Sequence, residues 1–288
     1  MDYRILGPVE VWHGAAPVNL GGAKQRALLA LLLLHANHVV ATERIVDELW
    51  GDTHPETAAN AVQVYVANLR KVLQPERVQG AASDVILTRA PGYLLRVQSD
   101  EVDLLRFEGL TAVARRVLAS DPQSATALLL EALQLWRGPA LADIVFEGPA
   151  RGEITRLGEL RLAAQEDRIQ GDLELGRHAA LVGELEALVA THPLRERLHA
   201  QLMLALYRCG RQAEALKAYR DARRMLIDEL GIEPCVELQS LEKAILVQDP
   251  ALTAPTWVAP APHPALAAPT WVAPAPHPWQ PPVTEDPG

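Results

Sequence analysis

The sequence has 288 residues, enough for two domains of ordinary size, and 49% of them are hydrophobic, so substantial cores can form. The net charge of −9 argues weakly against nucleic-acid binding. Residues 1–99, however, hold nine basic and nine acidic side chains, so the acidic excess lies in 100–288. A neutral N-terminal region can still bind DNA if its basic side chains share one face.

Several classes of protein are disfavoured by what the sequence lacks. Cys209 and Cys235 form no CxxC pair or ligand cluster, so we expect no disulfide and no metal site. The start of the chain has no signal-peptide layout. The longest apolar run, 27–34, is far shorter than the ~20 residues that span a bilayer. We therefore expect a soluble cytoplasmic protein, with no cofactor and no membrane partner.

Short strands and one helix are predicted at the N-terminus. Alternating or β-branched runs that end at turn residues indicate strands at 3–6, 9–12 and 18–20. A helix follows over 23–35, and Asn37 and His38 break it. The first 20 residues thus predict a small sheet that precedes a helix.

Two more helices and a hairpin complete the first region. Thr42 is predicted to cap a helix over 43–50, which Gly51 ends, and Thr57 to cap a helix over 58–73. Two β-rich runs, 85–89 and 93–97, flank Ala90-Pro91-Gly92 and indicate a hairpin. This order is typical of a winged helix-turn-helix domain, which we assign to 1–99.

The pattern is helical throughout 103–249. Leu175-Gly176 recurs as Cys209-Gly210 after 34 residues, the period of tetratricopeptide repeats, although an irregular helical bundle is the alternative. The segment 250–288 is rich in Pro and Ala and contains a tandem duplication, so we expect a disordered tail. The predicted fold is mainly α: an α+β winged helix-turn-helix domain, an all-α tetratricopeptide-like domain and this tail.

The helix predicted over 58–73 carries the candidate DNA-reading surface. At about 100° per residue, Val62, Val66, Leu69 and Leu73 form one buried stripe. The opposite face is short and nearly uncharged. It holds Asn60, Val64, Ala67 and Lys71, with Gln63 and Asn68 at its margins.

That outer face suits the major groove of DNA better than plain solvent. Amides pair with adenine, and small apolar groups contact the thymine methyl. Arg70 and Lys71 come where the helix leaves the groove, so we expect them to contact phosphate. Arg89, at the tip of the predicted hairpin, is expected to meet phosphate or the minor groove. A weakly amphipathic surface helix and a solvated arginine are the alternatives.

Together these motifs resemble a known family. Gly22–Leu29, Asp47–Gly51, Val62–Leu73 and Gly92-Tyr93 look like the OmpR-type winged helix of Streptomyces antibiotic regulatory proteins. Residues 132–139, 192–196, 207–216 and 229–234 resemble the bacterial transcriptional activator domain of the same proteins. The resemblance covers about 1–249, and its motifs agree in order.

The resemblance implies an activator of a secondary-metabolite (antibiotic) gene cluster. Such proteins bind double-stranded DNA at promoter direct repeats and help recruit the RNA polymerase holoenzyme, and we expect a homodimer on the DNA. It also places Asn60, Val64, Ala67 and Asn68 at DNA-facing positions. In the wider OmpR class, the positions of Ala67 and Asn68 are often arginine, so the base preference of that class is not expected here. Because no phosphate-binding GxxxxGK motif is found, we expect a small member without a nucleotide-hydrolysing module.

Two other classes of function compete with this interpretation. An enzyme is disfavoured because the sequence shows no HExxH, GxSxG or Cys/His pairing. His192 and His199, seven residues apart on a helical segment, are more simply a surface pair than a metal site. A tetratricopeptide-like adaptor that binds proteins but not DNA is the second alternative.

Overall fold

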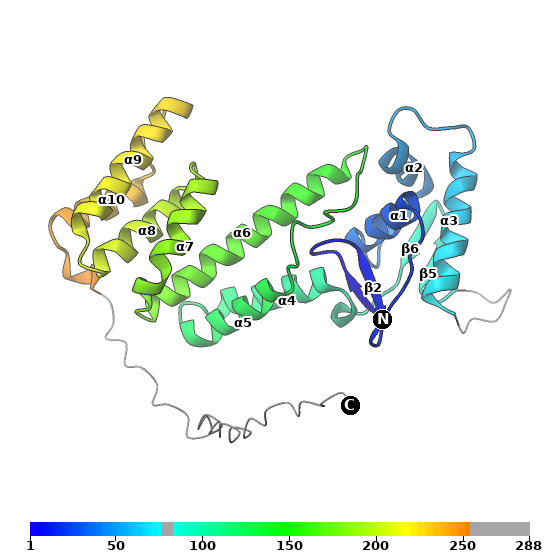
Figure 1. Ribbon diagram of the computed structural model, residues 1–288, viewed down its shortest axis with the longest axis horizontal. Coiled ribbons are helices and arrows are strands. Elements are labelled where there is room, and N and C mark those ends of the chain that lie inside the picture. The colour runs from blue at the N-terminus through cyan, green and yellow to red at the C-terminus, as the bar shows by residue number, and fades with distance from the viewer. Residues whose placement is uncertain (76–82, 254–288) are drawn as a thin grey trace, which may run out of the picture. The chain divides into compact units, whose positions relative to one another are not determined.

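A computed structural model describes residues 1–75 and 83–253. The described chain is mainly helical, with its strands confined to the N-terminal region (Figure 1). The N-terminal elements are β1 (Asp2–Arg4), β2 (Glu10–His13), β3 (Ala16–Pro17), α1 (Ala23–Leu34), β4 (Val39–Ala41), α2 (Thr42–Trp50), α3 (Ala58–Leu73), β5 (Ile86–Arg89) and β6 (Gly92–Leu95). The remaining elements are η1 (Ser99–Glu101), α4 (Asp103–Val117), α5 (Pro122–Gln134), α6 (Ala150–Glu174), α7 (His178–Thr191), α8 (Glu196–Arg208), α9 (Gln212–Leu230), α10 (Val236–Leu246) and η2 (Pro250–Leu252).

The first sheet is antiparallel, in the order β1-β2-β3. The strand predicted at 18–20 is wrong, because the third strand is Ala16–Pro17. A tight turn at Gly14, whose φ is +59°, folds the chain back at once, so that His13 pairs with Ala16. Val18 still donates its amide to the Val11 carbonyl at 2.8 Å, but outside the strand.

The two helix caps predicted from threonines do not form. Thr42 is the first residue of α2 rather than its cap, since β4 leads directly into the helix. Its amide and its hydroxyl both donate to the Pro91 carbonyl, at 3.2 Å and 3.3 Å. Thr57 occupies the position before α3, yet its side chain makes no capping bond. Contacts with the hairpin therefore outweigh local capping at Thr42.

The second sheet has the order β4-β6-β5. Its hairpin confirms the prediction for 85–97, whereas β4 was not predicted, because three residues are too few to show a strand period. Gly92 pairs with Ala41, and a Cβ atom there would lie 1.9 Å from the Val40 carbonyl oxygen. Glycine is therefore required where the hairpin meets β4.

The helical region contains the repeated turn that the 34-residue period predicts. Gly176 and Gly210 adopt left-handed conformations, with φ of +73° and +75°, between α6 and α7 and between α8 and α9. The amides of Arg177 and Arg211 each donate at 2.9 Å to the carbonyl five residues earlier. The two turns therefore share one backbone geometry, and the prediction of an all-α repeat region is confirmed.

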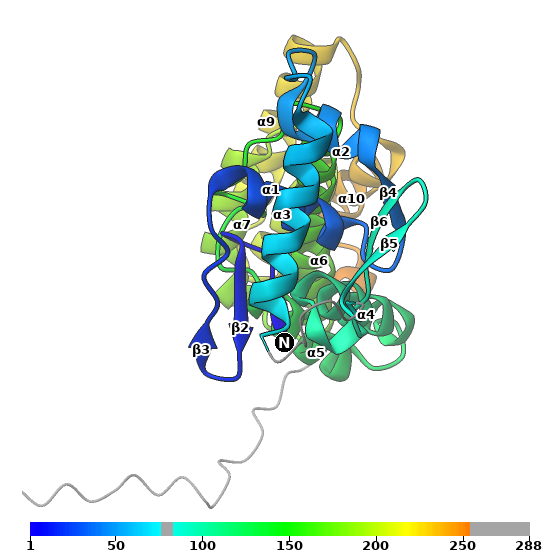
Figure 2. The ribbon, with the colours of Figure 1, turned by 90° about the vertical axis from the view of Figure 1, so that its right-hand side faces the viewer.

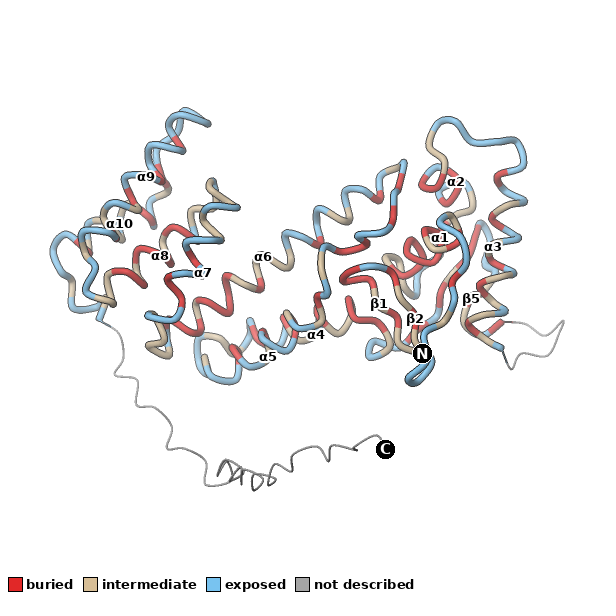
Figure 3. The backbone as a smooth tube through the Cα atoms, viewed as in Figure 1, coloured by how far each residue is buried: buried red, intermediate tan, exposed pale blue. Residues whose placement is uncertain are grey.

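The buried residues form two hydrophobic cores, and α6 contributes to both (Figure 3). The first core combines the N-terminal elements with α4 and α5, and includes Leu157 and Ala164 of α6. The second combines α7, α8, α9 and α10 with Leu162, Ile169 and Leu173 of α6. The first core thus includes residues on both sides of the boundary predicted between residues 99 and 103.

A buried carboxylate joins the N-terminal strands to the helical region. Asp103, at the start of α4, is 1% exposed and accepts the amides of Ile5 and Leu6 at 2.9 Å. It also accepts the amide of Leu104 at 2.8 Å. Burial raises the pKa of the Asp103 carboxyl above its ordinary value, although these hydrogen bonds favour the charged form. Asp103 thus satisfies amides at the end of β1.

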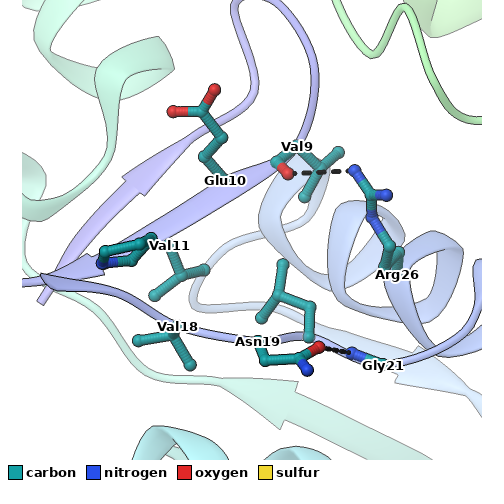
Figure 4. A pocket seen from close by; sticks show the side chains of 9 residues that line it. Val9, Glu10, Val11, Val18, Asn19, Gly21 and Arg26 are labelled. Atoms are coloured by element: carbon teal, nitrogen blue, oxygen red, sulfur yellow. Dashed lines mark hydrogen bonds between the residues drawn. The ribbon is translucent and has the colours of Figure 1, made fainter.

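A shallow hollow lies between β2, the segment after β3 and the start of α1 (Figure 4). Arg26 on its wall donates to the Val9 carbonyl at 3.3 Å and pairs with the Asp143 carboxylate. Asn19 accepts the Gly21 amide at 3.0 Å. These polar groups are engaged within the protein, and none of them belongs to the predicted DNA-binding set.

The C-terminal segment begins as ordered structure. Residues 250–252 form η2, and Arg208 donates to the Leu252 carbonyl at 2.9 Å. The predicted disordered tail therefore starts too early, because Leu252 packs on the second core. The rest of that prediction, from 254 onward, lies outside the described residues. Among the helices at 1–75 and 83–253, none is long and apolar enough to cross a membrane.

Replacing Asp103 tests whether this carboxylate holds the junction together. Asp103→Ala removes the acceptor of three backbone amides, so we expect the free energy of unfolding to fall by about 1 to 3 kcal/mol. Urea unfolding followed by circular dichroism measures the change. Asp100→Ala is the control, because Asp100 is exposed in η1. Equal effects of the two substitutions would contradict the structural role of Asp103.

Candidate DNA-binding interface

Helix α3 has one fully buried stripe and one open face. Val62 and Leu69 are 0% exposed, Val66 is 1% and Leu73 is 3%, which confirms the stripe predicted from the helical period. Figure 2 shows α3 in the foreground, with the β5–β6 hairpin beside it. The stripe contacts the first core, so its burial fixes which side of α3 faces outward.

The outer face contains the residues predicted to read DNA. Val64 is 56% exposed. Asn68 is half-buried at the margin of the face. The exposed members are Asn60, Gln63, Val64, Ala67 and Lys71. The structure thus brings these six predicted residues together on one side of α3, and their contact with DNA stays a prediction.

Arg70 links α3 to the hairpin. Its Nε donates to the Ile86 carbonyl at 3.0 Å, and its Nη2 donates to the Thr88 hydroxyl at 2.8 Å. These bonds bridge the end of the helix and β5, an arrangement that the sequence did not reveal. Arg70 therefore positions the hairpin. Its predicted contact with phosphate would have to form while these hydrogen bonds to β5 are in place.

Lys71 and Arg89 are the more accessible cations of this surface. Both side chains are exposed, and within residues 1–75 and 83–253 neither forms a salt bridge with a carboxylate. Arg89 ends β5, where it pairs with Gly92 across the hairpin. Exposed cations at the end of a helix and at a hairpin tip are suited to phosphate groups.

An aromatic contact that the sequence did not predict joins α2 to α3. Trp50 at the end of α2 stacks on Tyr65 of α3, with ring centroids 6.3 Å apart and an interplanar angle of 13°. Lys24 of α1 lies 5.6 Å from the Trp50 ring centroid and donates to the Leu49 carbonyl. Gly51 ends α2 with a φ of +61°. In the sequence, the only sign of this contact is that Trp50 and Tyr65 are both aromatic and lie 15 positions apart.

The surface pair predicted for His192 and His199 is wrong, because His199 is only 5% exposed. The His199 ring Nε2 lies 2.8 Å from the Pro193 carbonyl oxygen, and His192 ends α7. Over residues 1–75 and 83–253, no group of three or more His, Cys, Asp or Glu side chains could hold a metal ion.

Two known families match the two halves of the chain. Residues 16–95 match the family described as "Transcriptional regulatory protein, C terminal". Residues 102–246 match the "Bacterial transcriptional activator domain". The first match contains α3 and the hairpin, and the second begins beside Asp103.

Similar proteins agree with these matches. The regulatory protein DnrI of Streptomyces peucetius is 40% identical over 256 residues, which cover 88% of this chain and 94% of DnrI. The regulatory protein AfsR of Streptomyces coelicolor is 44% identical over 255 residues, but this chain spans only 25% of its length. Mycobacterium tuberculosis EmbR, solved in complex with a low-affinity phosphopeptide, has a TM-score of 0.82 and 35% identity over 86% of this chain and 65% of its own.

The orientation of α3 can be tested through stability. Leu69→Ala truncates a fully buried side chain, so we expect it to lower the free energy of unfolding by about 2 to 5 kcal/mol. Lys71→Ala is exposed and should change stability by less than about 0.5 kcal/mol. Chemical denaturation of both variants gives the comparison. A Lys71 variant that loses as much stability as the Leu69 variant would mean that the outer face is packed.

Proposed function

The chain belongs to the Streptomyces antibiotic regulatory protein family of OmpR-type DNA-binding transcriptional regulators, and we propose that it activates transcription from promoters that carry direct repeats. Both of its matched domains are regulatory rather than enzymatic. The observation that carries this proposal is the outer face of α3. Small polar and apolar side chains occupy it, and Lys71 and Arg89 supply exposed positive charge near its end. This is the chemistry that major-groove reading requires.

The proposal assigns different roles to different side chains. Asn60, Gln63, Val64, Ala67 and Asn68 meet base edges. Lys71 and Arg89 meet the DNA backbone or the minor groove, and Arg70 holds the hairpin in place beside the groove. Base contacts determine sequence preference, whereas phosphate contacts determine register and salt dependence.

The finer parts of the proposal concern the target and the partners. We propose that the target is a secondary-metabolite gene cluster, such as one for an antibiotic, that two copies occupy tandem repeats, and that the bound pair recruits the RNA polymerase holoenzyme. The chain spans only 25% of AfsR, so the activity of full-length AfsR is not part of this proposal. The helical region would supply the protein contacts.

DNA binding itself is the first test. We expect the full chain to bind duplexes from promoters near its own gene when they carry direct repeats, and the affinity to fall steeply as salt rises. Electrophoretic mobility shifts at several salt concentrations measure this. Binding that ignores salt, or no binding to any such promoter, would favour the adaptor alternative.

The second test separates base contacts from phosphate contacts. Asn68→Ala should change the preferred base at one position, at a cost of about 1 to 3 kcal/mol in binding free energy. Lys71→Ala should weaken binding to all sequences about equally and reduce the salt slope by roughly one unit.

Binding-site selection on the two variants distinguishes these outcomes. Glu56→Ala is a control at an exposed position before α3. If Lys71→Ala altered base preference while Asn68→Ala did not, the assignment of roles would be reversed.

A further inference from the structure

A second buried carboxylate lies at the contact between α2 and α6. Glu48 of α2 is 0% exposed, and its Oε2 accepts the amide of Ala150, the first residue of α6, at 2.8 Å. Its backbone carbonyl accepts the amide of Glu147 at 3.0 Å. One residue of the helix-turn-helix unit therefore holds both the approach to α6 and its first turn.

Two glycines, Gly148 and Gly51, leave room for the close contact around Glu48. A Cβ atom on Gly148 would lie 2.7 Å from the Glu48 Oε2 and 3.2 Å from its Cα. A Cβ atom on Gly51 would lie 3.2 Å from the Cβ of Glu147. Two glycines thus allow 147–150 to close over the end of α2.

Burying the Glu48 carboxylate is energetically costly. Its Oε1 is buried without a hydrogen-bond partner in the described chain, and its nearest cation is Arg44 Nε at 3.7 Å. Removing a carboxylate from water is unfavourable unless its partners compensate for the lost solvation. The free amides and positive end of a helix N-terminus provide part of that compensation. An apolar side chain would avoid that cost but would leave the buried Ala150 amide without this acceptor, which points to a geometric role for Glu48.

Helix α6 is the element that such an anchor would orient. It contributes to both cores, and Asp167 near its middle pairs with Arg115 of α4 at 2.7 Å and with Arg197 of α8 at 2.8 Å. Its 25 residues thus connect the helix-turn-helix unit with the repeat helices. A rotation of α6 about its first turn would move the whole second core.

We propose that Glu48 is a positioning residue, which fixes the direction of α6 relative to α2 and thereby sets the spacing between two DNA repeats that paired copies of the protein can occupy. This inference rests on the proposed function, because it assumes binding to tandem repeats. If Glu48 holds α6 rigidly, two bound copies touch only at certain separations between their DNA repeats. If the contact is flexible, the copies touch at many separations, but each separation adds less binding affinity.

The experiment uses the full chain with Glu48→Ala, Glu48→Gln and Gly148→Ala. Glu48→Gln keeps one acceptor oxygen for Ala150, so it should rescue part of the effect. Gly148→Ala keeps the Glu48 side chain, but the added Cβ atom would lie 2.7 Å from its Oε2 and so forces the carboxylate to move. Asp47→Ala is the matched control, since it removes an exposed carboxylate from the same helix. Leu129→Ala controls for general destabilisation, since Leu129 is buried in the first core on α5.

Two readouts are taken at a temperature at which every variant is folded. Hydrogen exchange followed by NMR reports protection of the Glu147 and Ala150 amides without DNA. Mobility shifts compare a single repeat with tandem repeats at the best spacing and at a spacing about five base pairs longer, which is half a helical turn. For the wild type, we expect the longer spacing to weaken tandem binding about tenfold.

We expect Glu48→Ala and Gly148→Ala to lower protection at the Ala150 amide about tenfold and to reduce the spacing preference to about threefold or less, with single-repeat affinity unchanged; the Glu147 amide keeps its backbone acceptor in both variants. The two control variants should keep both properties. Unchanged protection would overturn the anchor, and lost protection with an unchanged spacing preference would overturn its positioning role. A wild-type protein that binds no repeat at all would instead refute the proposed function, while the exchange data would still decide the anchor.

Discussion

Backbone amides at the contact between the N-terminal elements and the helical region are satisfied by two buried carboxylates. Asp103 accepts amides at the end of β1, and Glu48 accepts the first amide of α6. An unpaired buried amide is costly, so both acceptors are needed for this contact to close. The continuous first core and the orientation of α3 above it depend on that closure.

The DNA-facing side of α3 follows from packing rather than from charge. Burial of Val62, Val66 and Leu69 leaves Val64 and its neighbours outward, and Arg70 then ties the hairpin to the same helix. A neutral N-terminal region with a few well-placed cations can therefore present one coherent surface. The overall acidity of the chain arises elsewhere and does not oppose this interpretation.

Much of the fold was accessible from the sequence because its signals are local. The helical period located α3 to the residue, and the 34-residue spacing of Gly176 and Gly210 identified the repeated turn. The third strand was misplaced because the tight turn at Gly14 folds the chain back earlier than expected, and β4 is too short to show a strand period. The cap expected at Thr42 failed because Thr42 bonds instead to the distant Pro91, which no local pattern encodes. The roles of Glu48 and Asp103 were missed because a buried carboxylate resembles any surface acid in sequence.

Site-specific crosslinking to DNA tests the central claim most directly. A photoreactive phenylalanine derivative can replace Val64 on the outer face of α3 or Leu130 on α5, since both side chains are exposed, at 56% and 44%. With promoter DNA bound, irradiation should crosslink the protein to DNA from position 64 and not from position 130. Crosslinking from position 130 alone, or equally from both, would contradict the account of α3 as the recognition helix.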